Sequence, residues 1–352
     1  MTKIQVNSQG KAYLTTAGKA LAGVQPTLVT KSITENGTYN ASSDNADGYS
    51  SVTVNVSGGG SSTKYGVTID DIIGDTNSSG VLQYPEYRTI NMVFDGVTDI
   101  AGYGLMYALD YRNNIRANIS FPDLTQISGT AGLFCSFMNA NVTSVSFPEL
   151  VTINAQQACY NTFNNCPHLS NISLPKLTTI NGVQACCQMF GALPELTSIS
   201  LPALTTISGN NACYQMFYIC LSLISVSLPL LATINGDTVC QYMFYNCTVL
   251  ETISFPELTS ITGSSCFSYM FSQCSKLASI SFPKLTTTSF GNNVNQFSNM
   301  FNYNTGTQST SGTCTLHFPS NLESTIQGLT GYPLFGGTSG KIVLAFDLPA
   351  TT

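Results

Sequence analysis

The chain has 352 residues, of which 43% are hydrophobic and only 9% are charged. This apolar mass can bury a sizeable core, so the composition predicts a folded protein with one large domain or about two to three ordinary ones. The 12 Lys and Arg against 18 Asp and Glu give a net charge of −6. No basic patch is available to neutralise phosphates, which excludes nucleic acid as an expected partner.

Residues 1–23 contain no apolar run of signal-peptide length, and a run of about 18 apolar residues occurs nowhere in the chain. We therefore expect a protein that folds in the cytoplasm with reduced cysteines and has no membrane partner. It is not expected to cross a membrane.

Residues 1–56 predict a small β module, with an Asn-Gly hairpin signal at residues 36–37 and a strict alternation of Val52, Val54 and Val56. A piece this short cannot bury a stable core alone, so we expect it to dock onto another protein or to oligomerise. The phrases VNSQGKAYLTTAGKAL and ENGTYNASSDNADGYSSVTVNV resemble a small β module of bacteriophage tail structural proteins that precedes a Gly-rich linker. The resemblance implies a virion protein attached through this module.

A Gly/Ser tract at residues 57–63 predicts a flexible joint after the β module. Residues 64–118 differ in pattern from everything that follows them. We expect them to form an N-terminal cap fused to a first, irregular repeat.

The stretch DTNSSGVLQYPE at residues 75–86 matches the spacing of the oxygen ligands in an EF-hand calcium loop. The ligands in such a loop are Asp75, Asn77, Ser79 and Glu86. Pro85 just before the last ligand and Ser in place of a carboxylate count against calcium. A polar turn between a short helix and a strand explains the same residues, so both interpretations stay open and no metal site is assigned.

A Phe/Leu-Pro dipeptide then recurs along the chain. Its prolines are Pro122, Pro148, Pro175, Pro202, Pro229, Pro256 and Pro283. The intervals between them are all equal except the first, which is shorter by a single position. A fixed period of this length is typical of a solenoid.

One unit, LTSISLPALTTISGNNACYQMFYIC, covers residues 196–220. Its L-x-x-I-x-L pattern predicts a strand with one buried face, which Pro202 ends. Leu204 and Ile207 form a second short apolar pair before a Gly-containing turn at residues 208–210. The next apolar residues, Cys213, Met216, Phe217 and Cys220, follow the i, i+3, i+4, i+7 spacing of one stripe on a short helix.

The cysteines of the aligned units fall into two slots. The first slot holds Cys159, Cys186, Cys213, Cys240 and then Phe267, and the second holds Cys166, Leu193, Cys220, Cys247 and Cys274. A slot that accepts Phe or Leu requires a hydrophobe, whereas zinc needs closed sets of thiolates and disulfides need an oxidising compartment. We expect reduced cysteines stacked in a core ladder with methionines. Cys187, outside both slots, is predicted to be the most exposed thiol.

The L-x-x-I-x-L-P and M-F-x-x-C elements resemble the leucine-rich repeats of the BspA-like class over residues 119–318. The resemblance implies an α+β fold, a leucine-rich-repeat solenoid of 27-residue units with strand, Pro, second strand and helix. It implies no particular activity. After these units, residues 319–352 predict a C-terminal cap with a short helix and an edge strand, and KIVLAFDLPAT resembles the end of phage-encoded BspA-like repeats.

Groups able to perform catalysis are sparse and scattered. His168 and His317 lie far apart, and neither is near a nucleophile motif. Asp123, Glu149 and Glu257 occupy the slot after proline, which holds lysine, alanine or leucine in other units. Such variation argues against a catalytic pair, so we expect neither an enzyme nor a cofactor.

Two surfaces of the repeats are candidate binding sites. Strand residues Asn171, Ser198, Ser225, Thr252 and Ser279 predict a polar ladder for a glycan or protein, although Ser and Thr are also ordinary solvent-facing strand residues. On the helix side, a second contact surface is predicted by a set of tyrosines, because Tyr is favoured where contacts are made: Tyr160, Tyr214, Tyr218, Tyr242 and Tyr245. They are equally compatible with partial burial.

Together, these patterns predict a non-enzymatic phage virion protein of the tail or tail-fibre type. Its N-terminal module is expected to bind other virion proteins, and its repeats are expected to bind a host-surface protein or glycan. The sequence is also compatible with a homo-oligomer. It would fold in the host cytoplasm and be released by lysis. The alternatives are a bacterial surface adhesin, located at the cell surface, and a purely structural virion decoration protein.

Overall fold

The computed structural model describes residues 3–6, 12–15, 29–34, 51–57, 89–94, 97–100, 116–286, 294–297, 299–301, 314–328 and 342–351. The candidate calcium loop at residues 75–86 lies outside these ranges, as does most of the predicted N-terminal cap.

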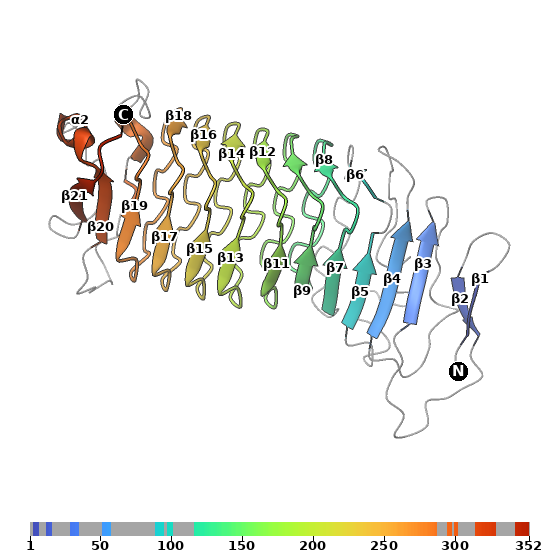
Figure 1. Ribbon diagram of the computed structural model, residues 1–352. Helices are drawn as coiled ribbons and strands as arrows, with labels where there is room; N and C mark the ends of the chain where they lie inside the picture. The colour runs from blue at the N-terminus through green and yellow to red at the C-terminus, as the bar shows by residue number, and fades with distance from the viewer. Residues whose placement is uncertain are drawn as a thin grey trace.

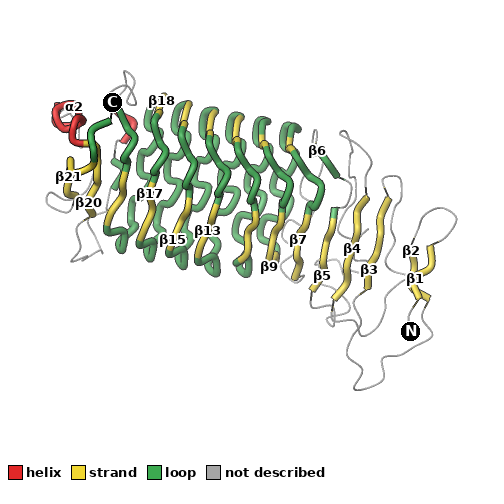
Figure 2. The backbone as a smooth tube through the Cα atoms, viewed as in Figure 1, coloured by secondary structure: helices red, strands yellow, loops and turns green. Residues whose placement is uncertain are grey.

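The chain forms a parallel β-solenoid of about seven turns whose coils lie side by side (Figure 1). Figure 2 shows the strands in two rows joined by loops, with helix only near the C-terminal end among the described residues. Equivalent positions in neighbouring coils are one proline period apart in most of the array, as in the parallel register of Ile180 with Ile207. The solenoid period predicted from the prolines is therefore confirmed.

One row of strands is a single seven-stranded sheet of short parallel strands. These are β6 (Asp99–Ile100), β8 (Gln126–Ile127), β10 (Thr152–Ile153), β12 (Thr179–Asn181), β14 (Thr206–Ser208), β16 (Thr233–Asn235) and β18 (Ser260–Thr262).

The other row contains two six-stranded sheets. The first consists of β3 (Val29–Thr34), β4 (Ser51–Ser57), β5 (Thr89–Val93), β7 (Arg116–Ser120), β9 (Asn141–Ser146) and β11 (Asn171–Ser173). The second consists of β13 (Ser198–Ser200), β15 (Ser225–Ser227), β17 (Thr252–Ser254), β19 (Ser279–Ser281), β20 (Cys314–Pro319) and β21 (Ile342–Leu348). Among the described residues, β11 and β13 are not hydrogen-bonded neighbours, so the row is interrupted there.

The N-terminal strands take two arrangements. β1 (Lys3–Val6) and β2 (Ala12–Thr15) form an antiparallel pair. β3 pairs in parallel with β4, and β4 in parallel with β5, so these strands extend the first six-stranded sheet. The predicted hairpin at residues 36–37 lies outside the described residues.

The short helix predicted in each unit is wrong. After β14, residues 210–219 form a run of consecutive turns, and every fourth residue has a positive φ: Asn211, Gln215 and Ile219 at 56°, 54° and 58°. Backbone N–H groups alternate in direction. The N–H of Tyr214 donates to Asn211 O within the coil (3.1 Å), and that of Gln215 donates to Gln241 O in the next coil (3.0 Å).

The spacing of the coils explains why turns replace the helix. Parallel strands of neighbouring coils lie about 4.8 Å apart, whereas an α-helix with its side chains is about 10–12 Å wide. Helices at this position would have to lie about twice as far apart as the strands, whereas the turn segments hydrogen-bond directly from coil to coil. Turns that repeat every fourth residue also direct Cys213, Met216, Phe217 and Cys220 into the core, and all four are fully buried.

The core consists of ladders of identical or similar side chains. Phe163, Phe190, Phe217, Phe244 and Phe271 stack ring on ring, with centroids 5.5–5.7 Å apart. In the short-strand sheet, Ile153, Ile180, Ile207, Ile234 and Ile261 are all fully buried. Burial of each such side chain stabilises the fold by about 1.5–3 kcal/mol. Equivalent positions of successive units thus form continuous ladders through the core.

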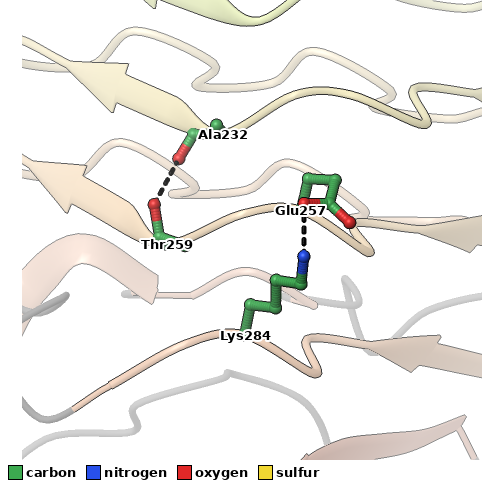
Figure 3. Close-up of polar contacts among 4 residues, drawn as sticks. All are labelled: Ala232, Glu257, Thr259 and Lys284. Carbon is green, nitrogen blue, oxygen red and sulfur yellow. Dashed lines mark hydrogen bonds and ion pairs between the residues drawn. The ribbon is translucent and has the colours of Figure 1, made fainter. Parts of the chain in front are cut away.

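The carbonyls before the short strands accept several hydrogen bonds from the next coil. The Oγ1 atom of Thr259 donates to Ala232 O over 3.3 Å (Figure 3), and the backbone N–H groups of Thr259 and Ser260 donate to the same oxygen over 3.0 and 3.2 Å. Such bonds tie each coil to its neighbour.

The C-terminal end contains the helix and strand that the sequence predicted there. η3 (Val294–Phe297), a 3-10 turn, follows the last repeats, and η4 (Ser320–Leu322) leads into α2 (Glu323–Gly328). β21 pairs in parallel with β20. It is the outermost strand of its sheet among the described residues.

Candidate binding surfaces

The two histidines do not share a site. Nδ1 of His168 lies 2.8 Å from Glu195 Oε1, and Nδ1 of His317 lies 2.9 Å from Asp347 Oδ1. Each pair joins neighbouring coils at the surface. Within the described part of the chain, no group of three or more His, Cys, Asp or Glu residues could hold a metal ion.

Two of the carboxylates after proline form ion pairs between coils. Lys176 Nζ lies 2.6 Å from Glu149 Oε2, and Lys284 Nζ lies 2.5 Å from Glu257 Oε2 (Figure 3). All four side chains are largely exposed, so each pair contributes only about 0–1 kcal/mol. The alternation of Glu and Lys in this slot thus has a structural explanation.

All twelve cysteines are buried and free, and the predicted core position is confirmed for the eight cysteines of the two slots. Burial raises the pKa of Cys166 and of Cys220 to about 12. At neutral pH these thiols therefore stay protonated and unreactive. In addition, second-slot thiols hydrogen-bond the preceding coil, as when Cys220 Sγ donates to Phe190 O over 3.2 Å. In the sequence, the one indication of this hydrogen bond was that Cys recurs at the second slot.

The prediction that Cys187 is exposed is wrong. Its side chain is 2% exposed, and burial raises its pKa to about 12. The prediction assumed a helix, in which the residue after a core position turns toward solvent. In the observed turns, Cys186 and Cys187 are both buried.

The predicted polar ladder on the long strands is present as a row of neighbouring side chains. Ser198, Ser225, Thr252 and Ser279 are in direct parallel register from β13 to β19, and Asn171 lies on β11 of the other sheet. All are exposed except the half-buried Ser225. The row offers hydroxyl groups on a regular surface.

The predicted tyrosines lie on a different surface, which is formed by the turn segments at residues 156–165, 183–190, 210–219, 237–246 and 266–273. We call this surface the turn side. The ring of Tyr218 stacks on that of Tyr245 with centroids 5.1 Å apart, and the ring of Tyr242 contacts those of Tyr214 and Tyr245 edge to face. All of the predicted tyrosines are half-buried, as the alternative interpretation expected, and their role in contacts stays a prediction.

Tyr269 belongs to the same cluster and was missed in the sequence. Its ring stacks on that of Tyr242 with centroids 4.8 Å apart. The signal was available, because Tyr269 follows Tyr242 by one full repeat and therefore takes the same position in the next coil.

The cluster surrounds a hollow of about 240 Å³. Tyr218, Tyr242, Tyr245 and Tyr269 line it together with Gln215, Ser272 and Gln273. Nε2 of Gln273 donates to the hydroxyl of Tyr245 over 2.7 Å. Burial, and then the neighbouring tyrosines, raise the pKa of Tyr218 and of Tyr242. The hollow is therefore a neutral site of aromatic rings, hydroxyls and amides.

A parallel solenoid with stacked surface rows is the architecture of a repeat protein suited to protein binding or adhesion. The comparison with known families agrees. Residues 134–300 and 214–324 match the BspA type leucine-rich repeat region in six copies, over more than half of the chain. The chain belongs to this family, whose leucine-rich repeats are generally non-enzymatic.

A leucine-rich repeat protein of T. pallidum with a solved crystal structure is 15% identical. The match covers 70% of this chain and 86% of that chain, with a TM-score of 0.25. No curated protein sequence matches the chain. Within the described residues, no helix has the length and apolarity needed to span a membrane.

Proposed function

We propose that the chain is a non-enzymatic structural protein of a phage tail or tail fibre, and that its solenoid binds a protein or glycan at the host surface. The observation that carries the binding role is the hollow on the turn side. The tyrosines there are grouped and half-buried, and they line a concave space. Rigid stacked coils hold these side chains in fixed positions before a ligand arrives, which lowers the entropic cost of binding.

The virion setting rests on the sequence phrases of residues 1–56 and 341–351, which resemble phage tail modules and the ends of phage-encoded repeats. In this proposal the N-terminal module binds other virion proteins. The protein folds in the host cytoplasm and leaves by lysis, and its buried, protonated thiols are compatible with that route.

Two other functions compete with this one. A bacterial surface adhesin would use the same solenoid at the cell surface, and a decoration protein would bind only to particles. The location of the protein distinguishes the first alternative, and its affinity for cells distinguishes the second.

The test uses the full-length protein in two measurements. Mass spectrometry of purified phage particles from the source bacteria should detect the chain, and labelled protein should bind those bacteria saturably. Detection in the bacterial cell-surface fraction without any in particles would favour the adhesin. Detection in particles without binding to cells would favour decoration, and the tail-fibre proposal would then be wrong.

A further inference from the structure

The hollow on the turn side lies where two columns of side chains change identity between coils. At intervals of one repeat, one column reads Gly191, Tyr218, Tyr245, Ser272, and its neighbour reads Gln188, Gln215, Tyr242, Tyr269. The rings of the first column begin and end at small residues. The second column changes from glutamine to tyrosine along the solenoid, next to the rings of the first column. The hollow is therefore lined by both aromatic rings and amide groups.

The first column of stacked rings ends at Tyr245, whose ring also meets that of Tyr242 edge to face. Within residues 116–286, all of which the structure describes, the ring stacked on Tyr245 is that of Tyr218. The next position of the column is Ser272, whose side chain is too short to cover a phenol ring. Ser272 and Tyr245 both line the hollow, so the end of this column of rings borders it.

The polar groups of the hollow retain unused hydrogen-bonding capacity. Within the described part of the chain, the hydroxyls of Tyr218, Tyr242 and Tyr269 have no hydrogen-bond partner. Gln215 accepts a hydrogen bond through Oε1 from Gln188, which leaves its Nε2 donors unpaired. Gln273 donates to Tyr245, and its Oε1 is an unpaired acceptor. The site thus presents donors and acceptors together.

None of the described residues that line the hollow carries a charge. A charged ligand would lose hydration there without gaining a counter-charge, which is unfavourable. A neutral ligand with hydroxyl or amide groups can replace its bonds to water with bonds to the tyrosine hydroxyls and glutamine amides.

We propose that this hollow binds one neutral sugar unit of a surface glycan, a deepening that rests on the binding role proposed above. A pyranose ring has an apolar C–H face, which packs on the ring of Tyr245 at the end of its column, and a rim of hydroxyls, which pairs with the surrounding phenols and amides. The volume of about 240 Å³ lies just below the range of about 300–1,000 Å³ for drug-sized ligands and so fits a single small unit. A protein partner would instead need a contact area of about 1,200–2,000 Å².

The test screens the full-length protein on an array of neutral and anionic bacterial oligosaccharides and then measures the affinity for the best neutral sugar by calorimetry. Tyr245→Ser removes the ring and introduces the residue that the next coil has at the equivalent position, Ser272. Tyr242→Phe removes only a hydroxyl. Tyr160→Phe is the matched control, because Tyr160 is a half-buried turn-side tyrosine that stacks on Phe134 outside the hollow.

Neutral glycans should bind, with a loss of about tenfold or more for Tyr245→Ser and about two- to tenfold for Tyr242→Phe, and with no change for Tyr160→Phe. The proposal is overturned if the array shows no neutral binder, if only anionic glycans bind, or if Tyr245→Ser binds as the parent does. In the first case, continued binding of the wild-type protein to cells would leave the broader binding role standing and point to a protein receptor.

Discussion

The inward and outward positions of the turn segments follow opposite rules. The inward Phe ladder keeps the same residue from Phe163 to Phe271, and these side chains are fully buried. The outward column beside it changes from Gln215 to Tyr242 between adjacent coils. In these two columns, the repeated ring therefore builds the solenoid, whereas the outward position, which differs from coil to coil, is available for binding. The predictions below break the inward ladders first and then probe the surface.

The largest effect is expected from Phe217→Ala. Phe217 is fully buried and stacks on Phe190 and Phe244, so its removal leaves a cavity between two coils that cannot collapse without breaking the ladder. We expect a loss of about 3–5 kcal/mol in the free energy of unfolding, measured by urea denaturation. Ser225→Ala on the strand surface is the control and should change stability by less than about 0.5 kcal/mol. Equal losses for both variants would contradict the ladder model.

A backbone position gives the next largest effect. Gly209 has a φ of 97°, and a Cβ atom there would lie 2.6 Å from Gly182 O in the preceding coil. Gly209→Ala should therefore destabilise the protein by about 1–3 kcal/mol in the same denaturation experiment. An unchanged midpoint would show that neighbouring coils are not in close backbone contact at this turn.

The buried thiols predict a loss of stability in alkali. A thiol has a pKa of about 8.5 in the unfolded chain, whereas burial raises that of Cys220 to about 12. Between these values the folded state keeps the proton that the unfolded state loses, so the free energy of unfolding falls as pH rises above about 8.5. Denaturation at about pH 8 and pH 10 measures this slope.

Cys220→Leu is the matched control, because Leu193 occupies the same slot one coil earlier. The variant should show a shallower decrease in stability between the two pH values than the parent. A steeper or identical decrease would mean that ionisation of this thiol is not coupled to unfolding.

The surface ion pairs should matter least. Lys284→Ala removes the cation paired with Glu257, and both side chains are largely exposed. The expected change is about 0–1 kcal/mol in the free energy of unfolding, and it should shrink further at high salt. A loss as large as that of Phe217→Ala would show that the surface rows hold the coils together.

Much of the fold is predictable from the sequence because it is a one-dimensional repeat. The proline period sets the coil length, and the alternation around Ile199 sets the buried face of β13. The helix was mispredicted because the spacing of Cys213, Met216, Phe217 and Cys220 fits turns that repeat every fourth residue as well as it fits a helix. Contact between coils decides between them, and that contact is not local in sequence.

The candidate binding residues were harder to predict. The hollow depends on which outward residues stack across coils, as Tyr242 does on Tyr269 and Tyr218 does on Tyr245. These stacked pairs cannot be recognised within a single unit. They become visible when the units are aligned at the repeat period. The tyrosines and the strand hydroxyls are both accessible, so a binding experiment has to compare them.

The most direct test compares the two surfaces in one assay of full-length protein binding to the source bacteria. One variant combines Tyr242→Ala with Tyr245→Ala on the turn side, and the other combines Ser198→Ala with Thr252→Ala on the strands. The binding role of the turn side predicts that the tyrosine pair weakens binding about tenfold or more, as expected for anchor residues, while the strand pair changes the affinity less than about twofold. A strong loss from the strand pair with an unaffected tyrosine pair would contradict it.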